Sequence, residues 1–296
     1  MTRLFFRLLQ FIFILSATNQ AFCQELNLNN RNPVIKDSGS ENVIPYCQLW
    51  AFSDDTINIY ISDKNGLFNF NSRPGKSYSS VWICKSGYET KIISSPKEME
   101  KDEFFLLATS SGKKIAVSGN SSTKVSSLVS LFPEYTCLVK LPGVKDDFII
   151  EYISVFTGRK YEEGQQLENQ LPFKLLLLKP DGKGNPGTAL FNKTIIVFPN
   201  ATEGSWIRFD ISPFRIMMPY EDVFAGLGCM SSGYYDDYKN NNPPSQRDVF
   251  LGSGRPGLFS NNNFECWMHM PWFEEWKILD RKNYHFMINA GISKAE

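Results

Sequence analysis

The chain has 296 residues, and its 31 basic and 31 acidic side chains leave it without net charge. Such a chain offers no positive field for phosphate groups, so we expect no nucleic-acid partner. The 24 Phe, 12 Tyr and 6 Trp residues can form a large apolar core, and they favour strands over helices.

Residues 1–23 have the organisation of a secretory signal peptide. Two arginines precede an apolar run over 8–17, and Ala21 and Cys23 stand just before Gln24. The run has about ten residues, roughly half the length of a membrane-spanning helix, which favours a cleaved leader over an anchor. We therefore expect export to the periplasm, the outer-membrane surface or the medium, with no transmembrane segment in the mature chain. The alternative is a lipid on Cys23.

The first module is predicted over 42–108, as a small β-sandwich. Its strands are expected at 44–52, 56–61, 68–71, 80–88 and 103–108, with a tight turn at 62–68.

The turn Asp63-x-x-Gly66 followed by Phe68, and the later strand ending in Gly87-Tyr88, resemble the carboxypeptidase regulatory-like domain, a transthyretin-like sandwich. The entering strand lacks the Gly-Thr that this family more often has. The resemblance implies a scaffold role and no peptidase activity, because the chain has no His-x-x-Glu zinc motif.

A polar passage over 109–127, rich in serine, is predicted to be a linker with one short strand. The second module, 128–296, is predicted to be a jelly-roll-like sandwich. Its strands are expected at 148–155, 173–178, 193–198, 206–211, 223–230, 264–268 and 285–290.

The order of motifs in this second module resembles secreted bacterial proteins that join a carboxypeptidase regulatory-like domain to a jelly roll. The motifs are Gly184-x-Pro186-Gly187, then Trp206-x-x-x-Asp210-Ile211-Ser212, an apolar strand at 224–227, and the late Trp272 and Trp276. The resemblance implies all-β architecture with two β-sandwich domains.

Five cysteines follow the leader, and none has the close spacing of a metal pair. In a domain of this size we expect buried thiols instead of a disulfide framework. We expect neither a metal nor another cofactor. The cysteines are Cys47, Cys84, Cys137, Cys229 and Cys266.

Catalytic motifs are sparse. No Gly-x-Ser-x-Gly elbow accompanies the histidines His269 and His285, and no glycine loop suits a phosphate. Asp210 is expected to accept hydrogen bonds in the turn that follows it. Two adjacent acidic pairs, Asp236-Asp237 and Glu274-Glu275, lack both the spacing of a calcium loop and the opposed placement of glycosidase carboxylates.

Aromatic residues near the C-terminus are the candidate ligand-binding residues: Tyr234, Tyr235, Tyr238, Trp272 and Trp276. Aromatic rings stack on sugars and anchor protein interfaces, although the same rings could fill the core. The sequence therefore predicts a non-catalytic exported protein that binds a glycan or an envelope protein. A hydrolase with a carboxylate-based site, and a purely structural envelope component, are the alternatives.

Overall fold

A computed structural model describes residues 26, 28, 32–68, 70, 77–109, 115–119, 127–144, 146–157, 171–199, 205–219, 221–241, 249–254, 264–279 and 285–295. The predicted leader at 1–23 and most of the predicted linker lie outside these residues. Within the described residues, no helix is both long enough and apolar enough to cross a membrane.

The described chain is mostly β-structure, which confirms the all-β prediction. Its first strands are β1 (Val34–Asp37), β2 (Gln48–Phe52), β3 (Thr56–Ile61), β4 (Ser80–Cys84), β5 (Lys91–Ile93), β6 (Glu103–Leu106), β7 (Ala116–Gly119), β8 (Ser127–Leu131), β9 (Thr136–Leu141) and β10 (Phe148–Thr157). The later strands are β11 (Phe173–Pro180), β12 (Pro186–Ala189), β13 (Thr194–Phe198), β14 (Ser205–Asp210), β15 (Val223–Cys229), β16 (Val249–Gly254), β17 (Cys266–His269), β18 (Lys277–Ile278), β19 (His285–Phe286) and β20 (Ile288–Lys294). The helical elements are α2 (Pro96–Met99), the 3-10 turn η1 (Ser212–Phe214) and α3 (Ser232–Asn241).

Several predicted boundaries differ from the structure. The strand expected at 44–52 begins only at Gln48, and Phe68 and Phe70 of the strand expected at 68–71 are not in a strand. The strand expected at 285–290 is interrupted at Met287. Because Tyr46 has a positive φ of 54°, the backbone leaves the extended conformation just before β2.

The strands form two large sheets and one small one. An 11-stranded sheet has the order β18-β17-β9-β15-β11-β13-β3-β2-β4-β5, with β12 beside β11. A 7-stranded sheet has the order β19-β16-β10-β20-β7, with β14 beside β10 and β8 beside β16, and β1 and β6 form a 2-stranded sheet. Apolar side chains of both large sheets share one core, including Ile153 of β10, Ile288 of β20 and Val139 of β9. The architecture is therefore a β-sandwich.

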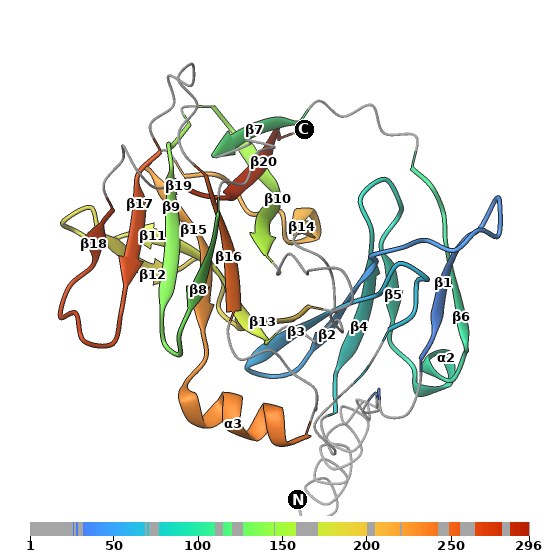
Figure 1. Ribbon diagram of the computed structural model, residues 1–296. Helices are drawn as coiled ribbons and strands as arrows, with labels where there is room; N and C mark the ends of the chain where they lie inside the picture. The colour runs from blue at the N-terminus through green and yellow to red at the C-terminus, as the bar shows by residue number, and fades with distance from the viewer. Residues whose placement is uncertain are drawn as a thin grey trace, which may run out of the picture.

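The large sheet crosses the predicted boundary between the two modules. Strand β3 pairs in parallel with β13, in a register that runs from Thr56 opposite Thr194 to Tyr60 opposite Phe198. Figure 1 shows β3, β2, β4 and β5 continuing from β13 toward the right-hand side of the molecule. The short strand β7, expected in the linker, pairs with β20 of the 7-stranded sheet. The predicted division into two domains is not confirmed, because its parts share a sheet and a core.

An aromatic seam connects the N-terminal strands to η1. Phe214 of η1 lies 5.4 Å from Trp50, 5.5 Å from Trp82 and 5.4 Å from Phe191, measured between ring centroids. Phe52 lies 4.5 Å from Trp82. We call these five residues the aromatic seam. The aromatic seam therefore supplies apolar contacts between the N-terminal strands and η1.

Strand β2 is buried on both of its faces. Trp50 and Phe52 belong to the shared core, whereas Leu49 and Ala51 belong to a second core with Phe68 of the N-terminal region. All five residues of β2 are buried. The sequence predicts a strand here, but it does not show that two layers cover it.

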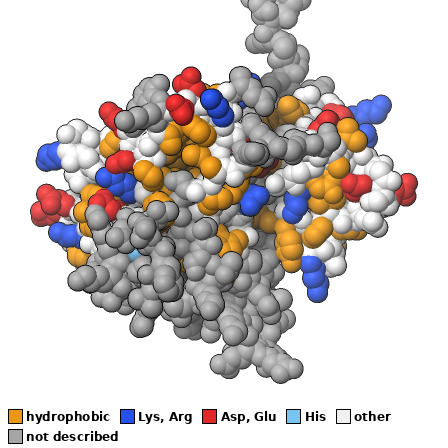
Figure 2. Space-filling model, turned by 90° about the horizontal axis from the view of Figure 1, so that it is seen from above, with side chains coloured by type: hydrophobic (Ala, Val, Ile, Leu, Met, Phe, Trp, Pro, Cys, Tyr) orange, Lys and Arg blue, Asp and Glu red, His pale blue; other side chains and the backbone are white. Residues whose placement is uncertain are grey.

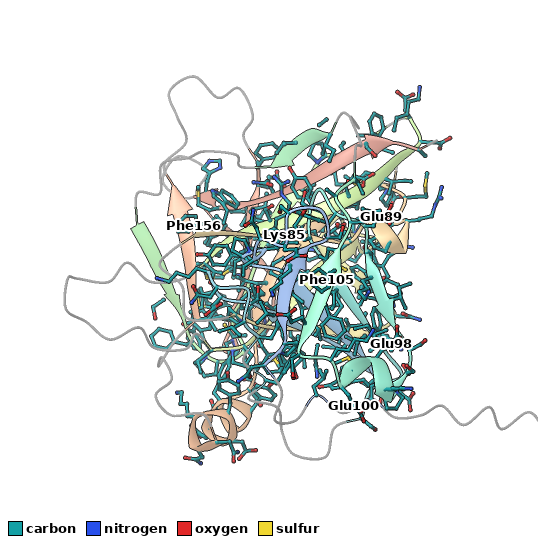
Figure 3. The ribbon with its side chains drawn as sticks, turned by 90° about the vertical axis from the view of Figure 1, so that its right-hand side faces the viewer. Lys85, Glu89, Glu98, Glu100, Phe105 and Phe156 are labelled. Atoms are coloured by element: carbon teal, nitrogen blue, oxygen red, sulfur yellow. The ribbon has the colours of Figure 1, made fainter. Side chains whose placement is uncertain are left out.

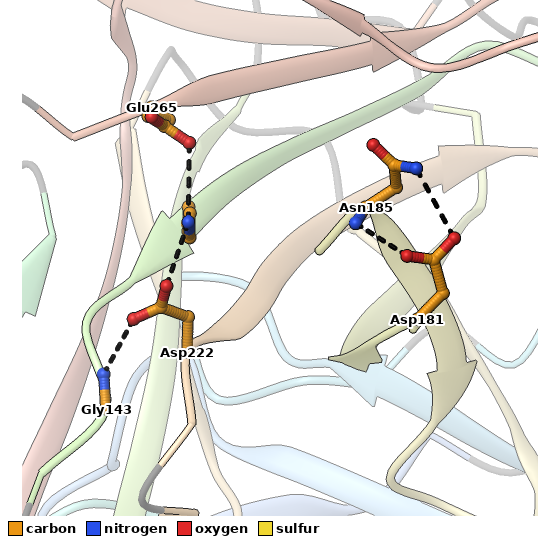
Figure 4. Close-up of polar contacts among 6 residues, drawn as sticks. Gly143, Asp181, Asn185, Asp222 and Glu265 are labelled. Atoms are coloured by element: carbon orange, nitrogen blue, oxygen red, sulfur yellow. Dashed lines mark hydrogen bonds and ion pairs between the residues drawn. The ribbon is translucent and has the colours of Figure 1, made fainter. Parts of the chain in front are cut away.

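The predicted turn at 62–68 and a second turn at 181–185 have the same hydrogen-bonded loop. The Asp63 Oδ1 atom accepts from the N–H groups of Asn65 (2.8 Å) and Leu67 (2.9 Å), and Gly66 has a φ of 70°. Likewise, Asp181 Oδ1 accepts from Asn185 N–H at 2.8 Å, as Figure 4 shows, and Gly184 has a φ of 83°. Each aspartate satisfies the backbone of its own turn, and each glycine adopts a conformation that L side chains rarely take.

The aromatic seam makes the cooperativity of folding testable. Phe214→Ala should lower the free energy of unfolding by roughly 2–4 kcal/mol, near the lower end of the range for large-to-small core changes because the ring is half-buried. Urea denaturation followed by tryptophan fluorescence and by circular dichroism should give one coincident transition. Two separate transitions, with only one shifted by the substitution, would show that the N-terminal strands fold independently.

Strand β14 provides a second test. Phe209 is fully buried in the core, whereas Trp206 is half-buried on the opposite face and contacts Phe156 at 5.9 Å between ring centroids. Phe209→Ala should therefore cost about 3–5 kcal/mol of stability, and Trp206→Ala less than about 2 kcal/mol. Thermal unfolding of the two variants measures the difference. Equal losses of stability in the two variants would contradict the observation that Phe209, and not Trp206, faces the core.

Candidate functional site

The three candidate tyrosines lie on helix α3. Tyr235 is 3% exposed, and its hydroxyl donates to the Pro172 carbonyl (2.9 Å) and accepts from the Met230 N–H (2.9 Å). Burial raises the pKa of Tyr235 well above its usual value. Tyr238 is 8% exposed and Tyr234 is half-buried. Of the two readings that the sequence leaves open for these rings, Tyr235 and Tyr238 therefore fit the core, because the helix turns them inward.

Asp210 acts within its own turn, as expected. Its Oδ1 atom accepts from the N–H (3.1 Å) and the hydroxyl (2.6 Å) of Ser212, and this holds the start of η1. Burial and the nearby charge of Glu151 raise the pKa of Asp210, while the Ser212 hydrogen bonds oppose the rise. Glu151 is itself buried and accepts from the Ser293 hydroxyl.

The five cysteines are all buried and unbridged, which confirms the expected burial. Burial raises the pKa of Cys47 and Cys84 to about 12 and that of Cys266 to about 11. Thiols in this state are not nucleophiles at neutral pH, because the thiolate is the reactive form.

The other charged candidate residues described in the structure do not gather at one site. Asp236 and Asp237 are exposed on α3, His269 packs against Trp276, and His285 is buried on β19. Across the described part of the chain, no three His, Cys, Asp or Glu side chains are grouped to hold a metal ion. On the face seen in Figure 2, basic and acidic side chains are interspersed among apolar ones.

The best candidate site is an aromatic cluster at one end of the large sheet. Trp272 lies in the loop between β17 and β18, and its side chain is 64% exposed. Its ring lies 5.4 Å from that of Tyr135 and 6.3 Å from that of Phe273, and Phe132 lies 5.5 Å from Tyr135. We call these four residues the rim cluster. Tyr135 is buried and anchors the cluster to the core, whereas Phe132 is 52% exposed.

Two turns hold the rim cluster in place. In the first, the Tyr135 N–H donates to the Phe132 carbonyl (3.2 Å) and the Glu134 N–H donates to the Met230 carbonyl (2.9 Å). In the second, the Phe273 N–H donates to the Met270 carbonyl (2.9 Å). The rings therefore project from backbone that hydrogen bonds fix, which lowers the entropy cost of ordering them for a partner.

Glu134 has an unfavourable backbone conformation in this site. Its φ is 65°, a left-handed value that costs an L side chain roughly 1–2 kcal/mol relative to a right-handed one. Turns of this kind favour glycine at that position. Glu134 is exposed, as are Glu274 and Glu275, which follow Phe273 in the other turn. Lys277 Nζ lies 5.7 Å from the centroid of the Phe273 ring.

A network of charges fixes the neighbouring strands. Lys140 Nζ lies 2.8 Å from Asp222 Oδ2 and 3.6 Å from Glu265 Oε2, and Asp222 Oδ1 accepts from the Gly143 N–H (3.1 Å). Figure 4 shows these contacts at Asp222 and Glu265. They tie the residues just before β15 and β17 to β9, so the loop of the β17–β18 hairpin extends from a well-anchored strand.

Trp276, the second candidate tryptophan, lies on the outer face of the same hairpin. It packs against a cluster formed by Leu138, Leu178, Phe224 and Trp267. Trp267 is 6% exposed, and its indole Nε1 has no hydrogen-bond partner among the described residues. The loop thus carries Trp272 in the rim cluster, and it is followed by Trp276, which packs on this second cluster.

Sequence reasoning identified Trp272 and Trp276 as candidates but missed Phe132 and Tyr135. The available signal was the run Phe132-Pro133-Glu134-Tyr135, in which a proline marks a turn between aromatic residues. That segment lay in a stretch with no predicted strand, and its contact with Trp272 is long-range.

Comparisons with protein-family models, curated proteins and solved structures give no match for this chain. The resemblance to the carboxypeptidase regulatory-like domain therefore stays an interpretation of the sequence.

The structural role of Tyr235 can be tested directly. Tyr235→Phe leaves the Pro172 carbonyl and the Met230 N–H without their partner and should cost about 1–3 kcal/mol of stability. The exposed Tyr46 supplies the control, since Tyr46→Phe should leave the melting temperature unchanged. A Tyr235→Phe variant as stable as the parent would contradict the buried placement of this hydroxyl.

Proposed function

We propose that this protein is an exported, non-catalytic binding protein, and that the rim cluster is its binding surface. The observation that supports the proposal most strongly is the large exposed ring of Trp272, held by the buried Tyr135. An exposed tryptophan loses water at an interface and gains a large contact area with little loss of side-chain freedom. Phe132 and Phe273 enlarge the same surface. The partner is a glycan or a protein of the envelope.

Export is part of the proposal and depends on the sequence of residues 1–23. The aromatic candidate residues identified from the sequence fall into two groups. Trp272 belongs to the proposed surface and Trp276 flanks it, whereas Tyr235 and Tyr238 contribute to the fold.

A hydrolase is the less supported alternative. Its best acidic pair is Glu151 and Asp210, which lie near one another on β10 and β14. Both carboxylates accept hydrogen bonds from serine side chains within the fold, which explains their placement without a substrate. The rim cluster has no comparable structural explanation for an exposed tryptophan.

The proposal predicts that a substitution at Trp272 affects binding but not stability. Trp272→Ala should abolish retention of the protein on an envelope fraction while changing the free energy of unfolding by less than about 1 kcal/mol, because exposed side chains contribute little to folding. Co-sedimentation with the envelope fraction and a melting curve measure the two quantities.

Phe105→Ala is the matched control. Phe105 is an exposed aromatic residue on β6, labelled in Figure 3 on the side of the molecule that faces the viewer there, far from the β17–β18 hairpin. This variant should bind as the parent does. Equal loss of retention in both variants would indicate nonspecific hydrophobic adsorption, and no loss in Trp272→Ala would refute the proposed surface.

A further inference from the structure

We infer that Asn65 is a modification site, at which water converts the side-chain amide into a carboxylate by way of a cyclic imide with Gly66, and that the turn formed by Asp63 controls the rate. The site is separate from the rim cluster and does not depend on the proposed function. It arises because an asparagine precedes a glycine that the fold requires, within a turn whose hydrogen bonds hold the backbone between them.

The reaction needs only these residues and water. The Gly66 backbone nitrogen loses its proton and attacks the Asn65 Cγ atom, so a new N–Cγ bond forms, the Cγ–Nδ2 bond breaks and ammonia leaves with the proton. Water then adds to one carbonyl of the imide and cleaves its bond to the nitrogen. Cleavage at Cγ leaves aspartate, whereas cleavage at the main-chain carbonyl leaves isoaspartate, whose main chain has an additional carbon atom. Glycine favours the ring closure, because it has no side chain to hinder the attack.

The fold requires glycine at this position of the turn. The φ of Gly66 is 70°, and a Cβ atom there would lie 2.6 Å from Val43 Cγ1 and 3.1 Å from the Ile44 carbonyl oxygen. The Gly66 carbonyl also accepts from the Ile35 N–H (3.4 Å), which joins the turn to β1. The nitrogen that attacks is therefore part of the packed fold, and no other residue can replace its glycine without strain.

In the folded turn, the proton of this nitrogen is already held. The Gly66 N–H donates to the Asp63 carbonyl (3.1 Å), and the N–H groups of Asn65 and Leu67 donate to Asp63 Oδ1 (2.8 and 2.9 Å). The Asp63 N–H donates to the Leu67 carbonyl (2.9 Å), which closes the turn. Loss of the Gly66 proton would break the first bond and place a second negative charge beside the Asp63 carboxylate, which is unfavourable. The reaction therefore proceeds from the locally opened turn.

A second turn has the same hydrogen bonds without this reactivity. Asp181 Oδ1 accepts from the N–H groups of Lys183 and Asn185 (both 2.8 Å), and the Gly184 N–H donates to the Asp181 carbonyl (3.0 Å). Figure 4 shows the contacts of Asp181 with Asn185. Lys183 occupies the position of Asn65, and a lysine side chain has no carbonyl group to attack. This type of turn thus needs the aspartate and the glycine but not the asparagine.

Conversion at Asn65 would damage the N-terminal layer. An additional carbon atom in the main chain changes the spacing of the N–H groups, so Asp63 Oδ1 can no longer accept from both sides of the turn. The turn leads directly into Phe68, which is 1% exposed and belongs to the second core. We therefore expect chains that contain isoaspartate to unfold at a lower temperature than unmodified chains.

The experiment follows conversion at Asn65 in the full chain after removal of residues 1–23, in mildly alkaline buffer. Peptide mapping by mass spectrometry and enzymatic methylation of isoaspartate measure the product, and the same chain in urea gives the rate without the turn. The folded parent should convert roughly tenfold or more slowly than the chain in urea, because the opened turn is a minor state. Asn65→Lys copies the second turn and should fold normally without forming isoaspartate at this position.

Matched variants test whether the turn controls the rate. Asp63→Ala removes the acceptor of two N–H groups and should accelerate conversion at Asn65 roughly tenfold. Asp181→Ala makes the same change in the second turn and should leave the rate at Asn65 unchanged. Lys183→Asn places an asparagine before Gly184, so this variant should convert slowly there when folded and rapidly in urea.

Contrary results overturn the inference. Conversion in the folded parent as fast as in urea would show that the turn gives no protection, and no conversion in urea would show that Asn65 is not a modification site. Equal acceleration by Asp63→Ala and Asp181→Ala would assign the control to global unfolding. If Asp63→Ala does not fold, Lys183→Asn decides the matter, because equal rates in its folded and unfolded chains would show that such a turn does not protect.

Discussion

The parallel pairing of β3 with β13 is the contact on which the remaining architecture depends. It places the N-terminal strands β2, β4 and β5 in the same sheet as the C-terminal ones, and it orients β2 so that its apolar faces enter two cores. Parallel strands cannot be joined by a short hairpin, and β3 and β13 are far apart in the sequence. Bringing them together therefore costs loop-closure entropy. The aromatic seam around Phe214 offsets part of that cost.

The candidate site lies at the β18 end of the same sheet. Strand β18 has two residues and forms the last strand beyond β17, so the loop that carries Trp272 belongs to a short edge hairpin. Short edge strands limit unwanted pairing between chains, and an edge loop can present side chains without disturbing the central strands. The contacts of Lys140 with Asp222 and Glu265 connect β9 to the starts of β15 and β17 beside this edge.

Local chemistry was predictable from the sequence, and long-range placement was not. The turns at Asp63 and Asp181 follow from Asp and Gly at fixed offsets, and the core strand β15 follows from its apolar run. The burial of Tyr235 did not follow, because α3 has a polar composition and its partner Pro172 is distant in sequence. The pairing of β3 with β13 and the contact of Tyr135 with Trp272 depend in the same way on segments that no local pattern connects.

This separation between the two ends of the sheet determines what a loss of binding means. The aromatic seam contains Trp50, Phe52, Trp82, Phe191 and Phe214, and none of these residues belongs to the rim cluster. Substitutions in groups that share no partner usually act additively on the free energy of unfolding. A change at Trp272 therefore leaves the seam intact, and its effect on ligand retention can be assigned to the surface itself. Tyr135 differs, because it belongs to both the shared core and the rim cluster, so its truncation would reduce stability and binding together.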